Sequence, residues 1–420
     1  MNIRKLLYLI ILIPSISGAQ SIFNTSDYQL DSNKIVFGIR SEVYSNSNSL
    51  TAAFLNKSLY GGFITADDKN QIFKRSREAN NAINLLNNSV FYAQRIDTLF
   101  GKKKTNLGFF VNAADRQENL ALFSKNAMQV ILNGNKQFAG ESTQLVPMEF
   151  KQFHYSQFQL GFTKSYATDN YFSLGVSFLY GQANRMGRAN RFDLITSETG
   201  ERISVDAEIL YQETDPNHSN FMQYNGAGAS IDFVGKFKVN LLRDSTNQAN
   251  FHFSVKDIGF INWHATSRQT VVDTFYSYTG VQIENVFDPN SKITGDNPGA
   301  ILDSVAVKST TAYQTAIPIT IHFYLTQNWR KWVFTIGGAH RLNAFYYPYF
   351  YGKGGYKFTN HWTAFGQINY GGYGKLGTGV EFTYEAKQYN FKLGSSNVEG
   401  FISPNTASGQ SIYVLLSYKL

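Results

Sequence analysis

Apolar residues alternate with small or polar ones in many segments of the chain, most plainly at its C-terminal end. Between Ser411 and Leu420 every second residue, from Ile412 onward, is apolar. Side chains of a strand point alternately to two faces, so this segment predicts a strand with one wholly apolar face. The segment from Phe172 to Tyr180 repeats the pattern, with serine and glycine on the other face. Strands of about ten residues with such faces are typical of a membrane wall between lipid and an inner space.

The same alternation predicts further strands along most of the chain. They cover residues 34–43, 89–96, 105–112, 150–163, 226–241, 250–258, 313–325, 332–345, 349–358, 362–370, 376–384 and 389–394. Short turns at 167–170, 326–331, 359–361 and 385–388 alternate with long polar loops at 181–224, 259–311 and 395–410. The first of these loops carries its own strand-like stretch at 203–211. Short inner turns opposite long outer loops are the rule for bacterial barrels. We therefore predict an all-β fold, a transmembrane antiparallel β-barrel of about 14 strands with one or two short helices.

Three segments near the N-terminus depart from this pattern. Residues 50–60 read as a weaker second strand, whereas residues 71–86 and 117–132 have apolar residues at helical spacing. The first helical stretch, extended to 71–88, is expected inside the lumen or at the membrane rim, or as a simple connecting helix. The polar residues 20–33 are expected in the lumen or the periplasm. Gly134 and Asn135 are expected to end the second helix.

The first 19 residues have the features of a secretory signal peptide. Arg4 and Lys5 form a basic region, residues 6–13 are apolar, and Ser17 and Ala19 are the small residues of a cleavage site. The apolar run is too short to cross a bilayer as a helix. The expected organisation is a signal peptide at 1–19 followed by one barrel at 20–420, integral in the bacterial outer membrane.

Composition agrees with this class. Aromatic residues make up 15% of the chain and charged residues only 16%, below the roughly 25% of soluble domains. There is no cysteine, which excludes disulfides, thiolate metal sites and a cysteine nucleophile. The formal net charge of +8 is scattered among serines and tyrosines, so no nucleic-acid partner is expected.

Few residues carry candidate chemistry. The seven histidines have no metal-ligand spacing, and residues 288–296 lack the ligands of a calcium loop. No catalytic residue, metal or cofactor is predicted, and the protein is not expected to be an enzyme. Arg185, Arg188 and Arg191, three apart in a long loop, are candidates for binding an acidic ligand or lipopolysaccharide phosphates, with solvent-exposed loop charge as the simpler interpretation.

One stretch resembles a known family. Residues Phe251 to Trp263, with the spacing Asp257-x-Gly259-x-x-x-Trp263, are similar to a strand in an uncharacterised family of outer-membrane barrels from Bacteroidota. The resemblance continues through the glycine-rich C-terminal strands. That family resembles more distantly the fatty-acid-transporter barrels and the barrel of the type IX secretion system. The resemblance implies about fourteen strands and a segment inside the lumen.

Three functions follow from these observations. The first is passage or capture of a small apolar ligand across the outer membrane, implied by the resemblance. The second is a non-transporting scaffold for secretion or surface assembly, with an envelope protein as partner. The third is a barrel enzyme. Outer-membrane lipids, lipopolysaccharide and the barrel-assembly machinery are expected partners, and a soluble periplasmic β-sandwich is the main structural alternative.

Overall fold

The computed structural model describes residues 35–99, 102–166, 170–218, 222–240, 248–279 and 305–420. They form one 19-stranded antiparallel sheet, of which 14 strands close into a barrel, as predicted. Strand β19 closes it by pairing with β1 from Val36↔Lys419 to Asn46↔Gly409. In order around the barrel, the strands are β1 (Ile35–Ser47), β2 (Ala79–Leu99), β3 (Lys102–Ser124), β5 (Met148–Ser165), β6 (Tyr171–Thr196), β8 (Gly226–Asn240), β9 (Gln248–Trp263), β13 (Ile319–Trp329), β14 (Trp332–Leu342), β15 (Tyr347–Lys357), β16 (Trp362–Gly372), β17 (Leu376–Glu385), β18 (Tyr389–Ser395) and β19 (Gly409–Lys419).

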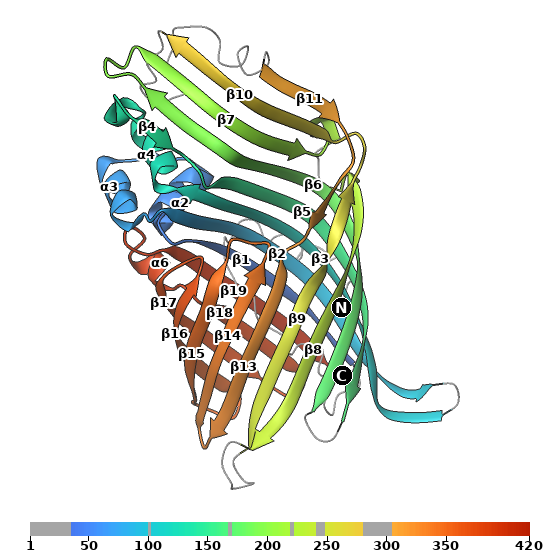
Figure 1. Cartoon of the computed structure of the whole chain (residues 1–420). Helices are drawn as coiled ribbons and strands as arrows, with labels where there is room; N and C mark the ends of the chain where they lie inside the picture. Colours follow the sequence, from blue (N-terminus) through green and yellow to red (C-terminus); the bar gives the residue numbers. More distant parts are fainter. Residues whose placement is uncertain (1–34, 100–101, 167–169, 219–221, 241–247, 280–304) are drawn as a thin grey trace.

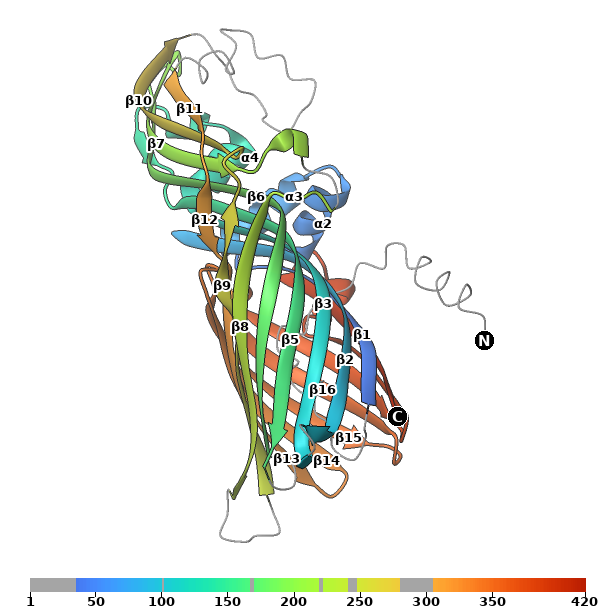
Figure 2. The same ribbon diagram turned by 90° about the vertical axis from the view of Figure 1, so that its right-hand side faces the viewer.

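The two ends of the barrel differ strongly (Figures 1 and 2). One end has the short turns between β13 and β14, β15 and β16, and β17 and β18, and there Ile35 N–H bonds the carbonyl of Leu420 at 3.2 Å. We call it the turn end. The other end, which we call the outer end, carries the helices and an additional sheet. Trp329, Trp332 and Trp362 lie beside the turns of the turn end, where aromatic rings suit a headgroup layer.

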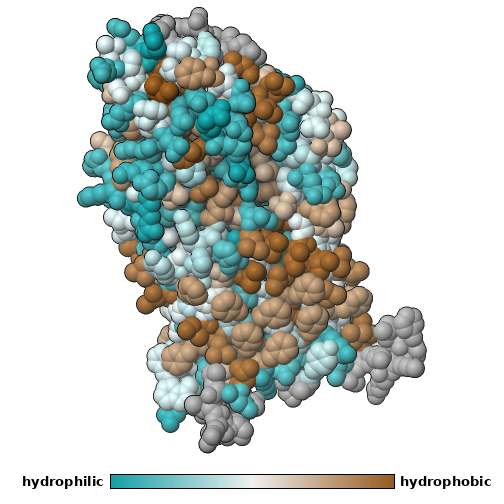
Figure 3. Space-filling view, in the orientation of Figure 1, coloured by the Kyte–Doolittle hydropathy of each residue, from teal (hydrophilic) through white to brown (hydrophobic). Residues whose placement is uncertain are grey.

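Apolar side chains point outward around the barrel, as the alternation predicted. Phe158, Leu160 and Phe162 on β5 are 47–54% exposed, whereas Ser173 and Ser177 on β6 are 3% and 2% exposed and face the interior. On the face drawn in Figure 3, outward residues form an apolar belt across the lower part of the molecule, below a polar outer part. This is the arrangement of a transmembrane barrel and excludes a β-sandwich with a buried apolar core.

A second region of sheet rises above the barrel. Strand β6 continues past the belt and pairs there with β4 (Ser142–Gln144) and β7 (Arg202–Glu213), and β7 pairs with β10 (Arg268–Thr279), which pairs with β11 (Ala306–Thr310). We call this five-strand region the outer sheet (Figure 1). The short β12 (Tyr313–Ala316) extends β13 alongside β9. The long loop predicted at 181–224 is therefore mostly strand, and only its strand-like stretch at 203–211 was predicted correctly, as part of β7. Parts of the long loop predicted at 259–311 form β10 and β11.

The described residues include four short α-helices, all at the outer end: α2 (Ala52–Tyr60), α3 (Ala66–Arg75), α4 (Lys125–Asn133) and α6 (Glu399–Ile402). Two 3₁₀ turns, η1 (Lys136–Phe138) and η2 (Pro216–His218), accompany them. Helices α2, α3 and α4 share a core that includes Phe54, Ile72 and Met128. Among the described residues no helix is both long and apolar enough to cross a membrane.

The three N-terminal exceptions are placed differently from the predictions. Residues 50–60 form helix α2 and not a strand, since the Thr51 hydroxyl caps it by accepting from Phe54 N–H. The helix expected at 71–86, or 71–88, lies at Ala66–Arg75, and strand β2 starts at Ala79. Of the helix expected at 117–132 only α4 is helical, and Gly134 ends it as expected. The signal peptide and the lumen element expected at 20–33 lie outside the described residues.

Candidate functional site in the barrel lumen

The lumen contains a bulge that aims a carboxylate inward. Between the pairs Ile231↔Ile258 and Phe233↔Val255, β8 has one residue, Asp232, where β9 has two. The second of these, Asp257, adopts a φ of 64°, a conformation that aspartate tolerates better than most residues. Its backbone N–H donates to Asp232 Oδ1 at 2.7 Å. The bulge therefore holds two carboxylates together inside the barrel.

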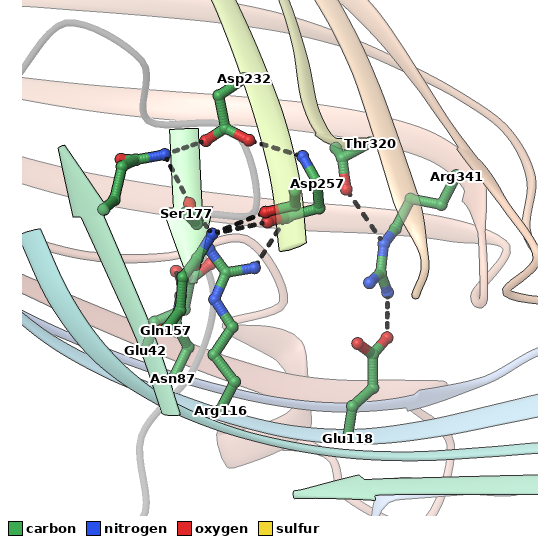
Figure 4. Close-up of polar contacts among 12 residues, drawn as sticks. Glu42, Asn87, Arg116, Glu118, Gln157, Ser177, Asp232, Asp257, Thr320 and Arg341 are labelled. Carbon is green, nitrogen blue, oxygen red and sulfur yellow. Dashed lines mark hydrogen bonds and ion pairs between the residues drawn. The ribbon is translucent and has the colours of Figure 1, made fainter. Parts of the chain in front are cut away.

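A network of polar side chains surrounds this bulge (Figure 4). Arg116 of β3 donates from Nη1 to Asp257 Oδ2 at 2.7 Å, across the space between non-adjacent strands. Gln157 Nε2 reaches Asp257 Oδ1 at 3.3 Å, and Gln159 Nε2 donates to Asp232 Oδ2 at 2.8 Å. The arginine supplies the positive charge that two buried carboxylates require.

A second ion pair crosses the lumen nearly from wall to wall. Arg341 Nη1 of β14 lies 2.5 Å from Glu118 Oε1 of β3, and their side chains are 4% and 6% exposed. In the barrel order β3 and β14 are separated by five strands on the shorter side, so they face each other. Arg341 also lies near the Thr320 hydroxyl, at 3.4 Å, and near Tyr373. The pair holds opposite walls together (Figure 4).

The turn between β14 and β15, residues 343–346, folds inward over the outer mouth of the lumen. Asn81 of β2 donates to the carbonyl of Phe345 at 2.6 Å, and the Lys151 ammonium of β5 lies 4.6 Å from the Phe345 ring. The Tyr373 hydroxyl donates to the carbonyl of Ala344 at 2.5 Å. We call residues 343–346 the mouth loop, since these contacts fix it to three different parts of the wall.

Beneath the mouth loop, apolar side chains from around the barrel pack into one cluster. Its largest members are aromatic, and all are buried: Tyr44, Phe153, Tyr155, Trp263, Tyr346, Tyr349 and Tyr373. Aliphatic residues of β2, β3 and β9 fill the spaces between them. We call this set the mouth cluster. Together with the cross-lumen pair, this cluster places buried side chains across the outer part of the lumen.

The motif that carried the family resemblance belongs to this closure. Asp257 is the bulge residue, and a Cβ on Gly259 would lie 2.2 Å from the carbonyl oxygen of Ala229, so only glycine allows β8 and β9 this approach. Trp263 is 1% exposed and donates from Nε1 to Thr315 Oγ1 at 2.8 Å. The residues of the motif Asp257-x-Gly259-x-x-x-Trp263 therefore have structural roles in the lumen wall.

The three predicted arginines do not form one site. They lie on the outer part of strand β6 and not in a loop, which corrects their expected placement. Arg191 is paired with Asp206 at 2.8 Å and Asp273 at 2.9 Å, and hydrogen bonds to these two carboxylates raise its pKa. Arg185 lies 3.6 Å from Glu213, while Arg188 is exposed. Their role in ligand binding remains a prediction.

The lumen residues Arg116, Glu118, Asp232 and Arg341 were not singled out from the sequence, and Asp257 was noted only as part of the resemblance motif. The sequence did contain a signal for them. Each is a charged residue at an inner-face position of a strand, where the other inner-face residues are mostly small and polar. Glu118 was missed because residues 117–132 were predicted to be a helix, and Arg116 because the predicted strand ended at residue 112, whereas β3 continues to Ser124. No cluster of three or more metal-ligating residues occurs within the described ranges. His154, 3.0 Å from Asp115, and His322, 3.0 Å from the Tyr351 hydroxyl, serve as wall residues.

Fold and lumen together define a closed, 14-stranded barrel with an apolar exterior. The chain belongs to a family of unknown function (DUF5723), whose model matches residues 25–396. No curated protein matches it.

Solved barrels of similar architecture include channels and transporters. A mutant of the monoaromatic hydrocarbon channel TodX shares 10% identity over 96% of both chains, with a TM-score of 0.43. A Pseudomonas aeruginosa FadL homologue shares 9% identity over 96% of this chain and 95% of its own, with a TM-score of 0.38. The Ralstonia pickettii toluene transporter TbuX shares 8% over 93% and 90%, with a TM-score of 0.30.

Proposed function

We propose that the protein is an integral barrel of the bacterial outer membrane that keeps its lumen closed and serves as a scaffold at the cell surface. Its localisation is supported by the apolar belt, which suits hydrocarbon, and by the aromatic side chains beside the short turns. The outer sheet and the helices would then lie outside the membrane, where an envelope protein can bind them. The barrel-assembly machinery and outer-membrane lipids are the remaining proposed partners.

The cross-lumen pair is the observation that carries the scaffold proposal. A water-filled passage solvates the charges that line it, whereas Glu118 and Arg341 are buried and contact each other at 2.5 Å. The mouth cluster adds buried apolar side chains to this part of the lumen. Separating such a pair inside a barrel leaves two uncompensated charges, which costs several kcal/mol. A molecule that diffused through this lumen would have to separate the Glu118–Arg341 pair, and each separation would cost several kcal/mol.

Conductance in a planar bilayer tests the closed lumen. The purified protein should insert without giving persistent current steps. A variant that shortens the mouth loop and carries Glu118→Ala and Arg341→Ala should give steps, which shows that the assay detects an opened barrel. Persistent steps from the wild-type protein would contradict the proposal.

For the scaffold role, an envelope protein should co-purify after crosslinking in cells and be lost when residues 197–201 of the outer sheet are replaced by a biotinylation-tag loop.

Passage or capture of a small apolar ligand is the second candidate. It is supported by the mouth cluster, whose aromatic rings would suit an apolar molecule if the mouth loop moved outward. In that case toluene or oleate should enter proteoliposomes that contain the protein faster than empty vesicles, and a crosslink between positions 81 and 345 should abolish the difference. Equal uptake with and without the protein rejects this candidate.

A further inference from the structure

Three cations lie together at the outer rim of the barrel. Arg75, at the end of α3, donates from Nη1 to the carbonyl of Thr406 at 2.7 Å and from Nη2 to Ser408 Oγ at 2.6 Å. Lys375, in the turn between β16 and β17, donates from Nζ to the carbonyl of Arg75 at 3.2 Å. Arg77 follows two residues after Arg75, and its side chain is exposed. The fold thus brings together cations from parts of the chain that are 300 residues apart.

The charge of this group is not balanced by acids. In the described part of the chain no carboxylate forms an ion pair with Arg75, Arg77 or Lys375. Burial lowers the pKa of Lys375, and the positive charges of Arg75 and Arg77 lower it further. By contrast, other basic groups of the outer end, such as Lys57 and Arg191, have carboxylate partners. An anion placed among the three cations would relieve their mutual repulsion.

Exposed apolar side chains occur in the two segments that these hydrogen bonds join to Arg75. Leu376 follows Lys375 directly and is 66% exposed, and Ile402 and Phe401 of α6 are 76% and 47% exposed. Helix α6 is fixed to the outer end of β17, because Glu399 Oε2 accepts from Thr378 N–H at 3.0 Å and from its hydroxyl at 2.9 Å. Figure 1 shows α6 beside that end of β17. The apolar surface of β17 continues downward through outward residues into the belt.

We propose that this group of residues is a binding site for a phosphorylated lipid of the outer leaflet. The guanidinium of Arg77 and the ammonium of Lys375 contact its phosphate, and Arg75 contributes charge while it keeps its hydrogen bonds to residues 406–408. The acyl chains lie on Leu376, Phe401 and Ile402. A free phosphate would use only the cations. A lipid uses the cations and the apolar residues together, and their side-by-side position at the edge of the belt favours it.

Lipid binding to the purified protein tests the site. The probe is bis-phosphorylated lipid A, added in detergent and followed by native mass spectrometry. The Arg77→Gln and Lys375→Gln double variant should bind it about tenfold or more weakly, since each charge-assisted hydrogen bond is worth about 1.5–3 kcal/mol. The Ile402→Ser variant should also bind more weakly. Lys387→Gln, which removes an exposed cation of the turn end, should bind like the wild type.

The proposed lipid site is contradicted if the double variant binds lipid A as the wild type does, or if dephosphorylated lipid A binds as well as the phosphorylated form. It is also overturned if inorganic pyrophosphate at the lipid's concentration displaces it fully, because the site would then recognise a free anion. Retained heat-modifiable migration in electrophoresis shows that each variant is folded.

A second measurement does not depend on affinity. Because the chain lacks cysteine, Ile402→Cys and Asn405→Cys each accept a single spin label. In lipid-A-containing vesicles the label at 402 should collide with oxygen and be shielded from a water-soluble nickel complex. The label at 405, an exposed polar position of the same segment, should show the reverse. Equal exposure of both labels to nickel would contradict the proposal.

Discussion

Individual residues inside this barrel carry ionic interactions that most soluble proteins keep at their surface. Glu118 and Arg341 are almost fully buried, and so are Asp232 and Asp257. A buried pair does not by itself guarantee stability, because desolvation offsets most of the attraction between its charges. Removing one partner of such a pair destabilises the protein strongly, because the remaining buried charge then has no opposite charge beside it.

The energy of the cross-lumen pair can be measured by a double-mutant cycle. Glu118→Ala should lower the free energy of unfolding from lipid vesicles in urea by about 3 kcal/mol or more, because Arg341 remains buried without a partner. Adding Arg341→Met should recover part of the loss. Asp206→Asn, which weakens an exposed pair with Arg191, should cost at most about 1 kcal/mol. If Glu118→Ala and Asp206→Asn lower the free energy of unfolding equally, water reaches the cross-lumen pair and the pair is not buried as described.

At the outer end, Asp68 predicts a pH dependence. Burial tends to raise its pKa, but hydrogen bonds from Lys57 and Thr65 outweigh burial and hold the pKa below the usual value. A carboxyl whose pKa is depressed on folding adds stability at neutral pH, which is lost as the pH falls through the folded pKa. Hydrogen exchange in residues 57–75 should therefore increase below about pH 4. Asp68→Asn, which also loses the capping box, should exchange faster already at pH 7 and show less change with pH.

At the scale of elements, the strands of the belt could be predicted, whereas of those above it only the stretch at 203–211, in β7, could. Within the belt each strand has one lipid face and one inner face, so the alternation is visible. Above the belt, Ala82 of β2 packs against the helices while Ile83 and Leu85 face the mouth cluster. Both faces of this part of β2 are therefore buried, so apolar residues do not alternate with polar ones along it. Their spacing resembled that of a helix, which is why a helix was predicted there. The cross-lumen pair could not be predicted either, because its partners are 223 residues apart in sequence.

The close approach of β8 and β9 gives a prediction about one element. Gly259→Ala places a methyl group 2.2 Å from the Ala229 carbonyl oxygen, so the bulge must shift and Asp257 must move from Arg116. We expect a loss of about 1–3 kcal/mol in urea unfolding. Gly366→Ala is the matched control, since nothing lies within 4 Å of the Cβ that it would carry. An unchanged midpoint for Gly259→Ala would contradict the packing described for the motif.

At the scale of the whole molecule, the belt and the outer sheet face different solvents. Leu160 on β5 and Phe275 on β10 are both large, apolar and exposed, at 54% and 62%. Only the first lies in the belt. Exposure alone does not separate them, but their position along the barrel axis does.

This difference can be tested with one pair of substitutions. Leu160→Arg should destabilise the protein in lipid by about 2–4 kcal/mol, because a charge near the middle of the bilayer must be desolvated. Phe275→Arg should change the free energy of unfolding by less than about 1 kcal/mol, as at an aqueous surface. Similar small effects at both positions in lipid vesicles would reject the membrane belt.

Strand β6 has a mechanical consequence. It is one strand from Tyr171 to Thr196, 26 residues or roughly 85 Å of extended chain. It belongs first to the barrel wall and then to the outer sheet, with one extra residue in its pairing at Gln182 and another at Asn190. No flexible linker separates the two parts. A pull on the outer sheet is therefore transmitted directly to the hydrogen-bond ladders between β5, β6 and β8, and the barrel resists it in shear and not by unzipping.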